Sequence, residues 1–125
     1  MNIVDSSGWL EYFADGPNAD FFAPAIENTA ELLVPTINLY EVFKRVLLQR
    51  GEDDALKVVA TMTHGRALDL TAPVALAAAK ISAREKLPMA DSIMLASARA
   101  SGALLWTQDG DLEGFPEVRF PREID

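Results

Sequence analysis

Short apolar runs alternate along the chain with longer segments in which apolar residues recur every three or four positions. The short runs have the length of buried strands, and the longer segments have the periodicity of amphipathic helices. Strands are predicted at residues 1–4, 31–35, 66–71, 103–106 and, at an edge, 118–120. Helices are predicted at residues 7–13, 18–28, 36–49, 52–62, 72–87 and 90–100. This alternation predicts an α/β fold, with a central parallel sheet of four to five strands flanked by helices on both faces.

Residues that break or cap helices separate these elements. Gly16 and Pro17 end the first predicted helix, and Pro88 closes the fifth. Thr36 is predicted to cap the third helix, and Gly51 to separate it from the fourth. The third and fourth helices are therefore expected to form a helical hairpin.

The composition fits one domain, residues 1–125. Of the 125 residues, 50% are hydrophobic, which is enough for one core and too few for two ordinary domains. The absence of cysteine excludes disulfides, a thiolate zinc site and catalysis by a thiol. The first five residues lack the features of a signal peptide, and no apolar run reaches the roughly 18 residues of a membrane span. A cytoplasmic protein without a membrane segment is expected.

The net charge of −8 at pH 7, taken alone, argues against a nucleic-acid ligand. Proteins that bind nucleic acids usually present basic surface that neutralises phosphates. Two circumstances weaken this objection. Carboxylates around a divalent cation no longer act as free negative charge, and a basic partner protein can supply phosphate contacts.

Four acidic residues are predicted to lie at one edge of the sheet. Ligands of open parallel sheets bind outside the carboxyl ends of the strands. Asp5 follows the first strand, and Asp109 follows the fourth, directly beyond Thr107 and Gln108. Glu41 lies in the second turn of the helix after the second strand, and Asp91 in the first turn of the sixth helix. Four segments that are distant in the sequence thus place a carboxylate on the same rim.

The surroundings of these carboxylates favour a metal site. Glu41 and Asp91 interrupt largely apolar stretches, where a carboxylate is costly unless it is paired or bound to a cation. Grouped carboxylates repel one another, which raises their pKa values until a positive charge binds. Oxygen ligands without nearby histidine or cysteine select Mg²⁺ or Mn²⁺. One or two such ions would bind phosphate oxygens and activate water for in-line attack on a phosphodiester.

Four residues are therefore expected to be catalytic, the first three as metal ligands and the last as a ligand or a water-positioning group: Asp5, Asp91, Asp109 and Glu41. Ser7 and Thr107 are expected to orient these ligands through hydrogen bonds. Asp111 either supports the metal site or only shapes the turn. Helix capping is the alternative for Asp5 and for Asp91, and it explains either residue alone better than it explains four acids on one rim.

Four segments, in this order, resemble the PIN-domain nucleases. They are Ile-Val-Asp-Ser-Ser at residues 3–7, the embedded Glu41, Ala-Asp-Ser-Ile-Met-Leu-Ala-Ser-Ala at residues 90–98, and Trp-Thr-Gln-Asp-Gly-Asp-Leu at residues 106–112. The chain looks most like a toxin of the VapC type, from Asn2 to about Phe120. No single segment is specific, but the ordered set is.

The resemblance implies a PIN-like three-layer sandwich and an endoribonuclease that depends on Mg²⁺ or Mn²⁺. It assigns the site to the same acids, with Ser7 and Thr107 as polar neighbours: Asp5, Glu41, Asp91 and Asp109. It also implies an RNA substrate, a homodimer, and inhibition by a small VapB-like antitoxin that binds operator DNA. Two features depart from the family pattern. Leu112 stands where the family often has an aromatic residue, and the chain is more acidic than an RNA-binding enzyme needs.

Residues outside the acidic set have simpler explanations. His64, at a helix end, suits a cap better than a catalytic base. Lys44, Arg45 and Arg50 are placed to contact RNA phosphates, although solvated helix charges are the commoner explanation. Five aromatic residues at helical spacing form either a groove for a partner's helix or, more commonly, part of the core: Trp9, Phe13, Phe21, Phe22 and Phe43.

Two other functions remain open beside the ribonuclease. The acidic surface and the aromatic first helices also suit a catalytically weak PIN-fold interaction module that acts by binding a protein partner. A third, less favoured hypothesis is a phosphohydrolase that acts on small molecules. Calorimetry with Mn²⁺ distinguishes the ribonuclease from the interaction module, because the module would bind no cation at millimolar concentration.

Overall fold

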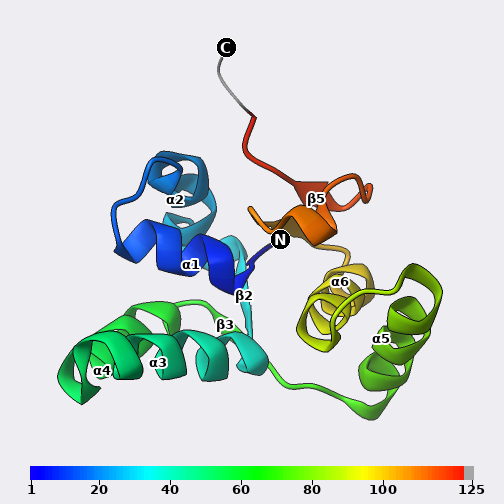
Figure 1. Ribbon diagram of the computed structural model, residues 1–125, viewed down its shortest axis with the longest axis horizontal. Helices are drawn as coiled ribbons and strands as arrows, with labels where there is room; N and C mark the ends of the chain where they lie inside the picture. Colours follow the sequence, from blue (N-terminus) through cyan, green and yellow to red (C-terminus); the bar gives the residue numbers. More distant parts are fainter. Residues whose placement is uncertain (123–125) are drawn as a thin grey trace.

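The computed structural model describes residues 1–122, which contain one five-stranded sheet (Figure 1). All neighbouring strands are parallel, and their order is β3-β2-β1-β4-β5. The strands are β1 (Asn2–Val4), β2 (Leu32–Pro35), β3 (Arg66–Leu68), β4 (Leu104–Trp106) and β5 (Val118–Arg119). Ile3 pairs with Leu33 on one side and with Leu105 on the other, so β1 is the central strand. The predicted parallel sheet is confirmed.

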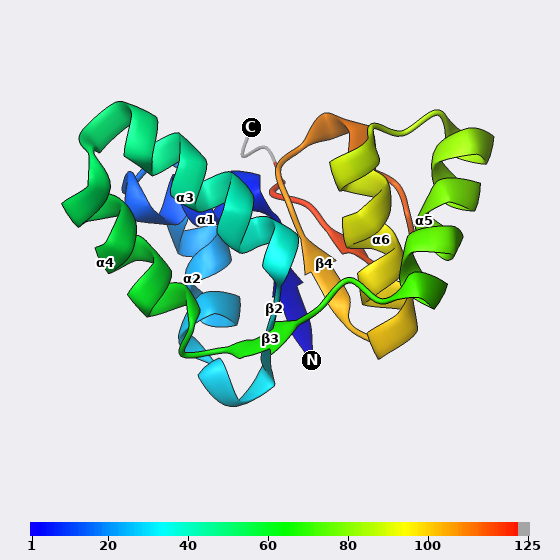
Figure 2. The same ribbon diagram turned by 90° about the horizontal axis from the view of Figure 1, so that it is seen from below.

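Helices cover both faces of the sheet (Figure 2). The α-helices are α1 (Ser6–Phe13), α2 (Ala19–Glu27), α3 (Thr36–Arg50), α4 (Glu52–Met62), α5 (Ala72–Glu85) and α6 (Met89–Ser101), and the 3-10 helices are η1 (Thr29–Glu31) and η2 (Gly110–Leu112). One face packs against α1 to α4, and the other against α5 and α6. This is the expected three-layer sandwich. Among the described residues, no helix combines the length and the apolar character needed to cross a membrane.

The alternation of side chains along the strands builds a separate core on each face. Ile3 and Leu33 pack with buried residues of α5 and α6. Their neighbours Val4 and Val34 pack with residues of α1 to α4, including the fully buried Trp9. Because successive strand residues face opposite sides and both sides are covered, these strands are apolar at successive positions, apart from Asn2 at the start of β1.

The observed bounds agree with the sequence prediction to within two residues, except at the end of the third strand, and one predicted cap also differs. The third strand ends at Leu68 instead of Thr71, because the chain leaves the sheet there, and Thr71 Oγ1 instead accepts a hydrogen bond from the Val74 N–H and caps α5. Thr36 is the first residue of α3 and forms no capping bond. Pro35 occupies the cap position and still pairs with Leu68 in the sheet, so the helix begins only after it. The predicted hairpin of α3 and α4 is confirmed, with Gly51 between them at a φ of 92°.

The order of connections creates a crevice between β1 and β4. The chain leads from β1 outward to β2 and β3, and then returns through α5 and α6 to β4, on the other side of β1. Where successive connections diverge in this way, a ligand crevice opens at the carboxyl ends of the two strands. The Asp5 N–H donates a hydrogen bond to the Trp106 carbonyl at 2.9 Å. The loops that follow β1 and β4 are therefore held side by side at this crevice.

Candidate active site

Two hydroxyl groups hold Asp5 at the carboxyl end of β1. Its side chain is 5% exposed and occupies the N-cap position of α1, yet it forms no capping bond. Instead, Asp5 Oδ2 accepts hydrogen bonds from Ser7 Oγ at 3.0 Å and from Thr107 Oγ1 at 2.9 Å. Helix capping therefore does not explain Asp5, and its carboxylate is oriented by Ser7 and Thr107.

Thr107 also fixes the loop that carries Asp109. Its side chain is fully buried, and its Oγ1 accepts a hydrogen bond from the Asp109 N–H at 2.9 Å while it donates to Asp5. Asp109 Oδ1 accepts a further hydrogen bond from the Asp111 N–H at 3.0 Å, at the start of η2. One hydroxyl thus connects the carboxylate after β1 with the loop after β4.

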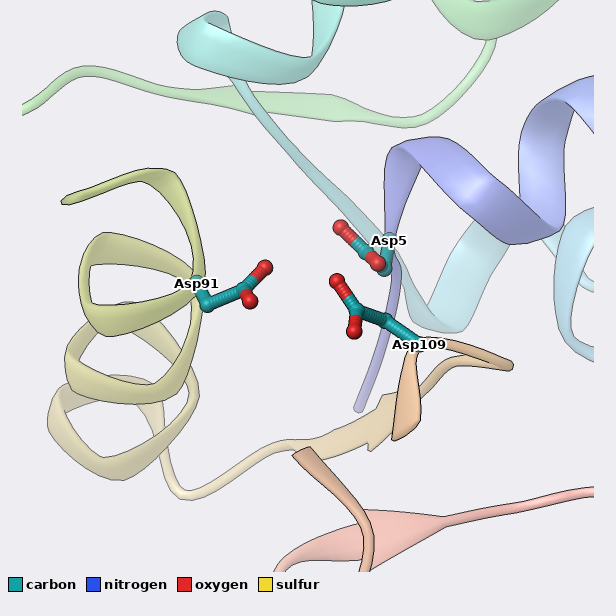
Figure 3. Close-up of side chains that lie close together, drawn as sticks. All are labelled: Asp5, Asp91 and Asp109. Carbon is teal, nitrogen blue, oxygen red and sulfur yellow. The ribbon is translucent and has the colours of Figure 1, made fainter. Parts of the chain in front are cut away.

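Asp91 reaches the crevice from the opposite layer of the sandwich. It lies in the first turn of α6 and is 7% exposed, and the cap position of this helix is occupied by Pro88. Residues 91–98 of α6 are all buried. Asp91 is therefore not a cap, and a tightly packed helix points its carboxylate toward Asp5 and Asp109 (Figure 3).

Glu41 approaches from α3, and Ser6 orients it. Ser6 Oγ lies 2.7 Å from Glu41 Oε1 and 3.1 Å from Asn38 Oδ1, so its single proton is shared between two acceptors. Asn38 is fully buried, and its Nδ2 donates to the Val4 carbonyl at 2.8 Å. Asn38 therefore ties α3 to the end of β1, and Ser6 extends this restraint to Glu41.

The three aspartates converge on one small space. One carboxylate oxygen each of Asp5, Asp91 and Asp109 lies within 4.8 Å of the others (Figure 3). Glu41 lies outside this group but lines the same cleft, which has a volume of about 500 Å³. Within residues 1–122, no cationic group lies within 4.0 Å of these four carboxylates. The acids predicted for one rim thus surround one cleft, and no cation of the described chain neutralises them.

Burial and mutual repulsion raise the pKa values of three of these acids. Burial, followed by the charges of Asp109 and Asp5, raises the pKa of Asp91 to about 7. Burial also raises the pKa of Asp5, although two hydroxyls donate hydrogen bonds to it. Burial is also the main cause of the raised pKa of Glu41. A divalent cation in the cleft would favour the charged carboxylates and so lower these pKa values.

The donor set fits a hard divalent cation. The close group offers carboxylate oxygens only, which Mg²⁺ and Mn²⁺ prefer. The cysteine-free chain has one histidine, His64, which is exposed beyond the end of α4 and does not line the cleft. The residues that can hold a cation are therefore Asp5, Asp91 and Asp109, with Glu41 beside them.

Other residues singled out in the sequence do not belong to the group of three aspartates. Asp111 is exposed and does not line the cleft, and its backbone N–H shapes the turn at Asp109. Leu112 is fully buried in the core beside α6, where an aliphatic side chain packs well. The aromatic residues considered for a partner groove belong to the core formed with α1 to α4, where the first two listed are fully buried: Trp9, Phe22, Phe13, Phe21 and Phe43.

Sequence reasoning did not single out several polar residues that line or support the cleft: Ser6, Glu11, Asn38 and Gln108. Asn38 carried a usable signal, because it precedes Glu41 by three positions and interrupts an apolar stretch on the same helix face. Glu11 carried none. Its carboxylate accepts a hydrogen bond from the Asn18 N–H at 2.8 Å, a contact that only the turn between α1 and α2 creates.

A sequence model of the PIN domain matches residues 3–120, a range that includes all four acids and every strand except the first residue of β1. The chain belongs to the PIN domain family. The comparison with curated proteins gave no match. In this PIN domain the acids thus lie at the edge of the sheet where open α/β folds bind ligands.

Solved structures share this PIN fold at low sequence identity. A chain of the toxin–antitoxin complex from Klebsiella pneumoniae has a TM-score of 0.81 at 20% identity, with 99% of this chain and 100% of that chain covered. VapC20 from Mycobacterium tuberculosis, a toxin that cleaves the sarcin–ricin loop, has a TM-score of 0.73 at 21% identity, covering 95% and 99%. DNA-bound VapBC from Salmonella typhimurium has a TM-score of 0.74 at 17% identity, covering 97% and 96%. These similarities confirm the predicted fold.

Proposed function

We propose that this PIN domain is a metal-dependent endoribonuclease, the toxin of a VapBC-type toxin–antitoxin pair. The observation that carries the proposal is the group formed by Asp5, Asp91 and Asp109, whose carboxylate oxygens lie within 4.8 Å of one another. Membership of the PIN domain family supports it. So does the likeness to toxins, one of which cleaves an RNA loop.

Each acid has a defined part in this proposal. Asp5, Asp91 and Asp109 would hold Mg²⁺ or Mn²⁺, which supplies a Lewis acid for the activation of water and positive charge for the phosphate. Thr107 keeps Asp5 and the Asp109 loop in a fixed relation. Glu41, which lies outside the close group, would orient water or accept a proton at the side of the cleft, held there by its bond from Ser6.

Cleavage of a structured RNA tests the proposal. We expect cleavage with Mg²⁺ or Mn²⁺ and none after chelation. Asp5→Asn and Asp91→Asn should each lower the rate at least about a hundredfold, because each removes a charge from the ion's ligand set. Glu117→Gln, which removes an acid beside the start of β5, is the matched control. Activity of both aspartate variants at the wild-type level would refute the proposal, and turnover of a phosphomonoester would favour the small-molecule phosphohydrolase.

A catalytically weak interaction module is the second candidate. The net charge of −8 favours it, as does a hollow of about 280 Å³ between α1 and the α3–α4 hairpin, lined in part by Leu10, Phe13 and Val58. Calorimetry with Mn²⁺ decides between the two. Cation binding that is lost in Asp91→Asn supports the nuclease, and the absence of binding at millimolar Mn²⁺ supports the module.

The proposal includes two protein partners. A small VapB-like antitoxin is supported by the structural neighbours, several of which are toxin–antitoxin complexes. A homodimer is supported by large apolar side chains that the single chain leaves exposed, including Tyr40, Leu48, Leu76 and Met89 at 64%, 76%, 68% and 72%. Sedimentation at micromolar concentration should give the mass of a dimer, and a monomeric mass would refute this part.

A further inference from the structure

Among residues 1–122, the wall of the acidic cleft contains one cationic residue. Five carboxylates line it, those of the four candidate catalytic acids and that of Glu11, and the one basic residue among the lining residues is Arg45 of α3. RNA is a polyanion, and its binding depends mainly on cationic side chains that contact phosphates. Bound cations would neutralise the phosphate that reacts, whereas the neighbouring phosphates would need positive charge from the protein.

The guanidinium of Arg45 has no partner among the described residues. It forms no ion pair within 4.0 Å and no hydrogen bond, and its side chain is exposed. Other basic residues of the hairpin are differently placed. Lys44 lies over the Tyr40 ring at 5.7 Å, and Arg50 lies 4.0 Å from Asp54 outside the cleft. Arg45 is therefore the basic residue that lines the acidic cleft and has no ion-pair partner among the described residues.

Arg45 also lies at a suitable distance from the acid group. It follows Glu41 by four positions, which places both on the same face of α3, with Arg45 displaced by about 6 Å along the helix axis. Gln49 follows by four more positions and lines the same cleft. The wall thus presents an acid, a cation and a neutral amide in succession along α3, leading away from the three aspartates.

We propose that Arg45 binds a phosphate of the RNA strand that neighbours the scissile one, and so directs the strand along α3. The planar guanidinium offers paired N–H donors that match two phosphate oxygens, which lysine cannot reproduce. Arg45 is in this role a positioning residue and takes no part in bond breaking. The inference rests on the proposed ribonuclease function.

The test compares Arg45→Gln with Arg84→Gln, an equal change of charge at an exposed position of α5 away from the cleft. In cleavage of a structured RNA with Mn²⁺, Arg45→Gln should raise KM about tenfold and leave kcat within about twofold. Arg45→Lys should be intermediate. The slope of log KM against log salt should fall by about 0.7 in Arg45→Gln, the loss of one phosphate contact on a single strand. Arg84→Gln should match the wild type.

A reduced kcat at unchanged KM, or equal behaviour of the two glutamine variants, would overturn the inference. A second arm separates this failure from failure of the proposed function. Binding of a fluorescein-labelled single-stranded RNA is measured by anisotropy in Mg²⁺, for Asp91→Asn and for Asp91→Asn with Arg45→Gln. If the wild type cleaves no RNA, the nuclease proposal is refuted. Weaker binding by the double variant then still supports the phosphate contact, and equal binding refutes it.

Discussion

The two ends of the sheet both carry acids, but their environments differ. At the amino ends of the strands, Glu31 lies 3.4 Å from the N-terminal amine of Met1, and Glu117 lies 2.8 Å from Arg99 Nε. At the carboxyl ends, the four acids of the cleft have hydroxyl groups, backbone N–H groups and one another as neighbours, with no cationic group of the described chain within 4.0 Å. The same chemical group therefore has an internal counter-ion at one end and needs an external cation at the other.

The pKa values at the two ends shift in opposite directions. Burial alone would raise the pKa of Glu117, but the hydrogen bond and charge of Arg99 outweigh it and lower the pKa. For Asp91, burial and the charges of Asp109 and Asp5 act together and raise the pKa to about 7. Ionised Glu117 thus stabilises the fold at the amino ends, whereas ionised Asp91 opposes it at the carboxyl ends until a cation binds.

The largest effect that tests this contrast is the pH dependence of stability without metal. Because the pKa of Asp91 is raised in the folded state, this state binds more protons than the unfolded state from about pH 4 to about 7, and the free energy of unfolding falls as pH rises. The pKa of Glu117 is lowered, so its contribution to the free energy of unfolding is lost only in acid. Above pH 5 Glu117 therefore does not change the slope of the free energy of unfolding against pH. Urea unfolding in chelator should show a decrease of roughly a few kcal/mol from pH 5 to 8.

Asp91→Asn is the control for this pH dependence. The neutral side chain removes the titrating group and also relieves the repulsion at Asp5, so the curve should become much flatter. Glu117→Gln should keep the wild-type slope. A wild-type curve that rises between pH 5 and 8 would contradict the account of the cleft.

Next in size is the stabilisation by divalent cations at pH 7.5. An ion that binds the folded protein alone stabilises it by about 2.7 kcal/mol at a concentration one hundred times its dissociation constant. Mn²⁺ should therefore raise the thermal unfolding midpoint of the wild type and of Glu117→Gln. It should leave the midpoint of Asp91→Asn nearly unchanged. Equal increases in all three proteins would place the ion elsewhere.

The sequence was sufficient for the parts of the site that depend on local position. Asp5 directly follows one short apolar run and Asp109 lies three residues beyond another, and parallel strands bring such positions to one edge. It was not sufficient for contacts between distant segments. The hydrogen bonds of Ser6 with Asn38 and Glu41 span 32 and 35 residues, and they depend on how α3 lies over β1.

The sequence separated Glu41 from the three aspartates only in part, because it left open whether Glu41 is a metal ligand or a water-positioning group. All four acids were predicted for one rim, but only side-chain geometry shows which three oxygens come within 4.8 Å. The lack of counter-ions is likewise a property of the folded chain, since Arg45 lies near Glu41 in the sequence without forming an ion pair. Two details differ from the prediction. The chain leaves the sheet after Leu68 instead of Thr71, and Pro35, which still pairs with Leu68, occupies the cap position predicted for Thr36.

The third effect concerns the hydroxyl that joins the two loops at the crevice. Thr107→Val keeps the volume of the buried side chain, but it removes the donor to Asp5 Oδ2 and the acceptor of the Asp109 N–H. Loss of such a ligand-orienting group typically costs about 10- to 100-fold in metal affinity or activity. We expect this loss in kcat/KM for RNA and in the Mn²⁺ affinity measured by calorimetry. Thr107→Ser, which keeps the hydroxyl, should retain most of both, and equal losses in the two variants would indicate a packing role.

The smallest effect is expected at the amino ends of the strands. Glu117→Gln removes one partner of the pair with Arg99, whose side chains are 26% and 40% exposed, so the free energy of unfolding should fall by about 0.5–1 kcal/mol. Added salt screens the pair and should reduce this difference. Because the pair lies at the end of the sheet opposite the cleft, cleavage of RNA should stay within about twofold of the wild type. Urea unfolding at low and high salt, with an RNA cleavage assay on the same samples, provides the measurement. A tenfold loss of cleavage at unchanged stability would show that the two ends are coupled, and the contrast between structural and metal-binding acids would then fail.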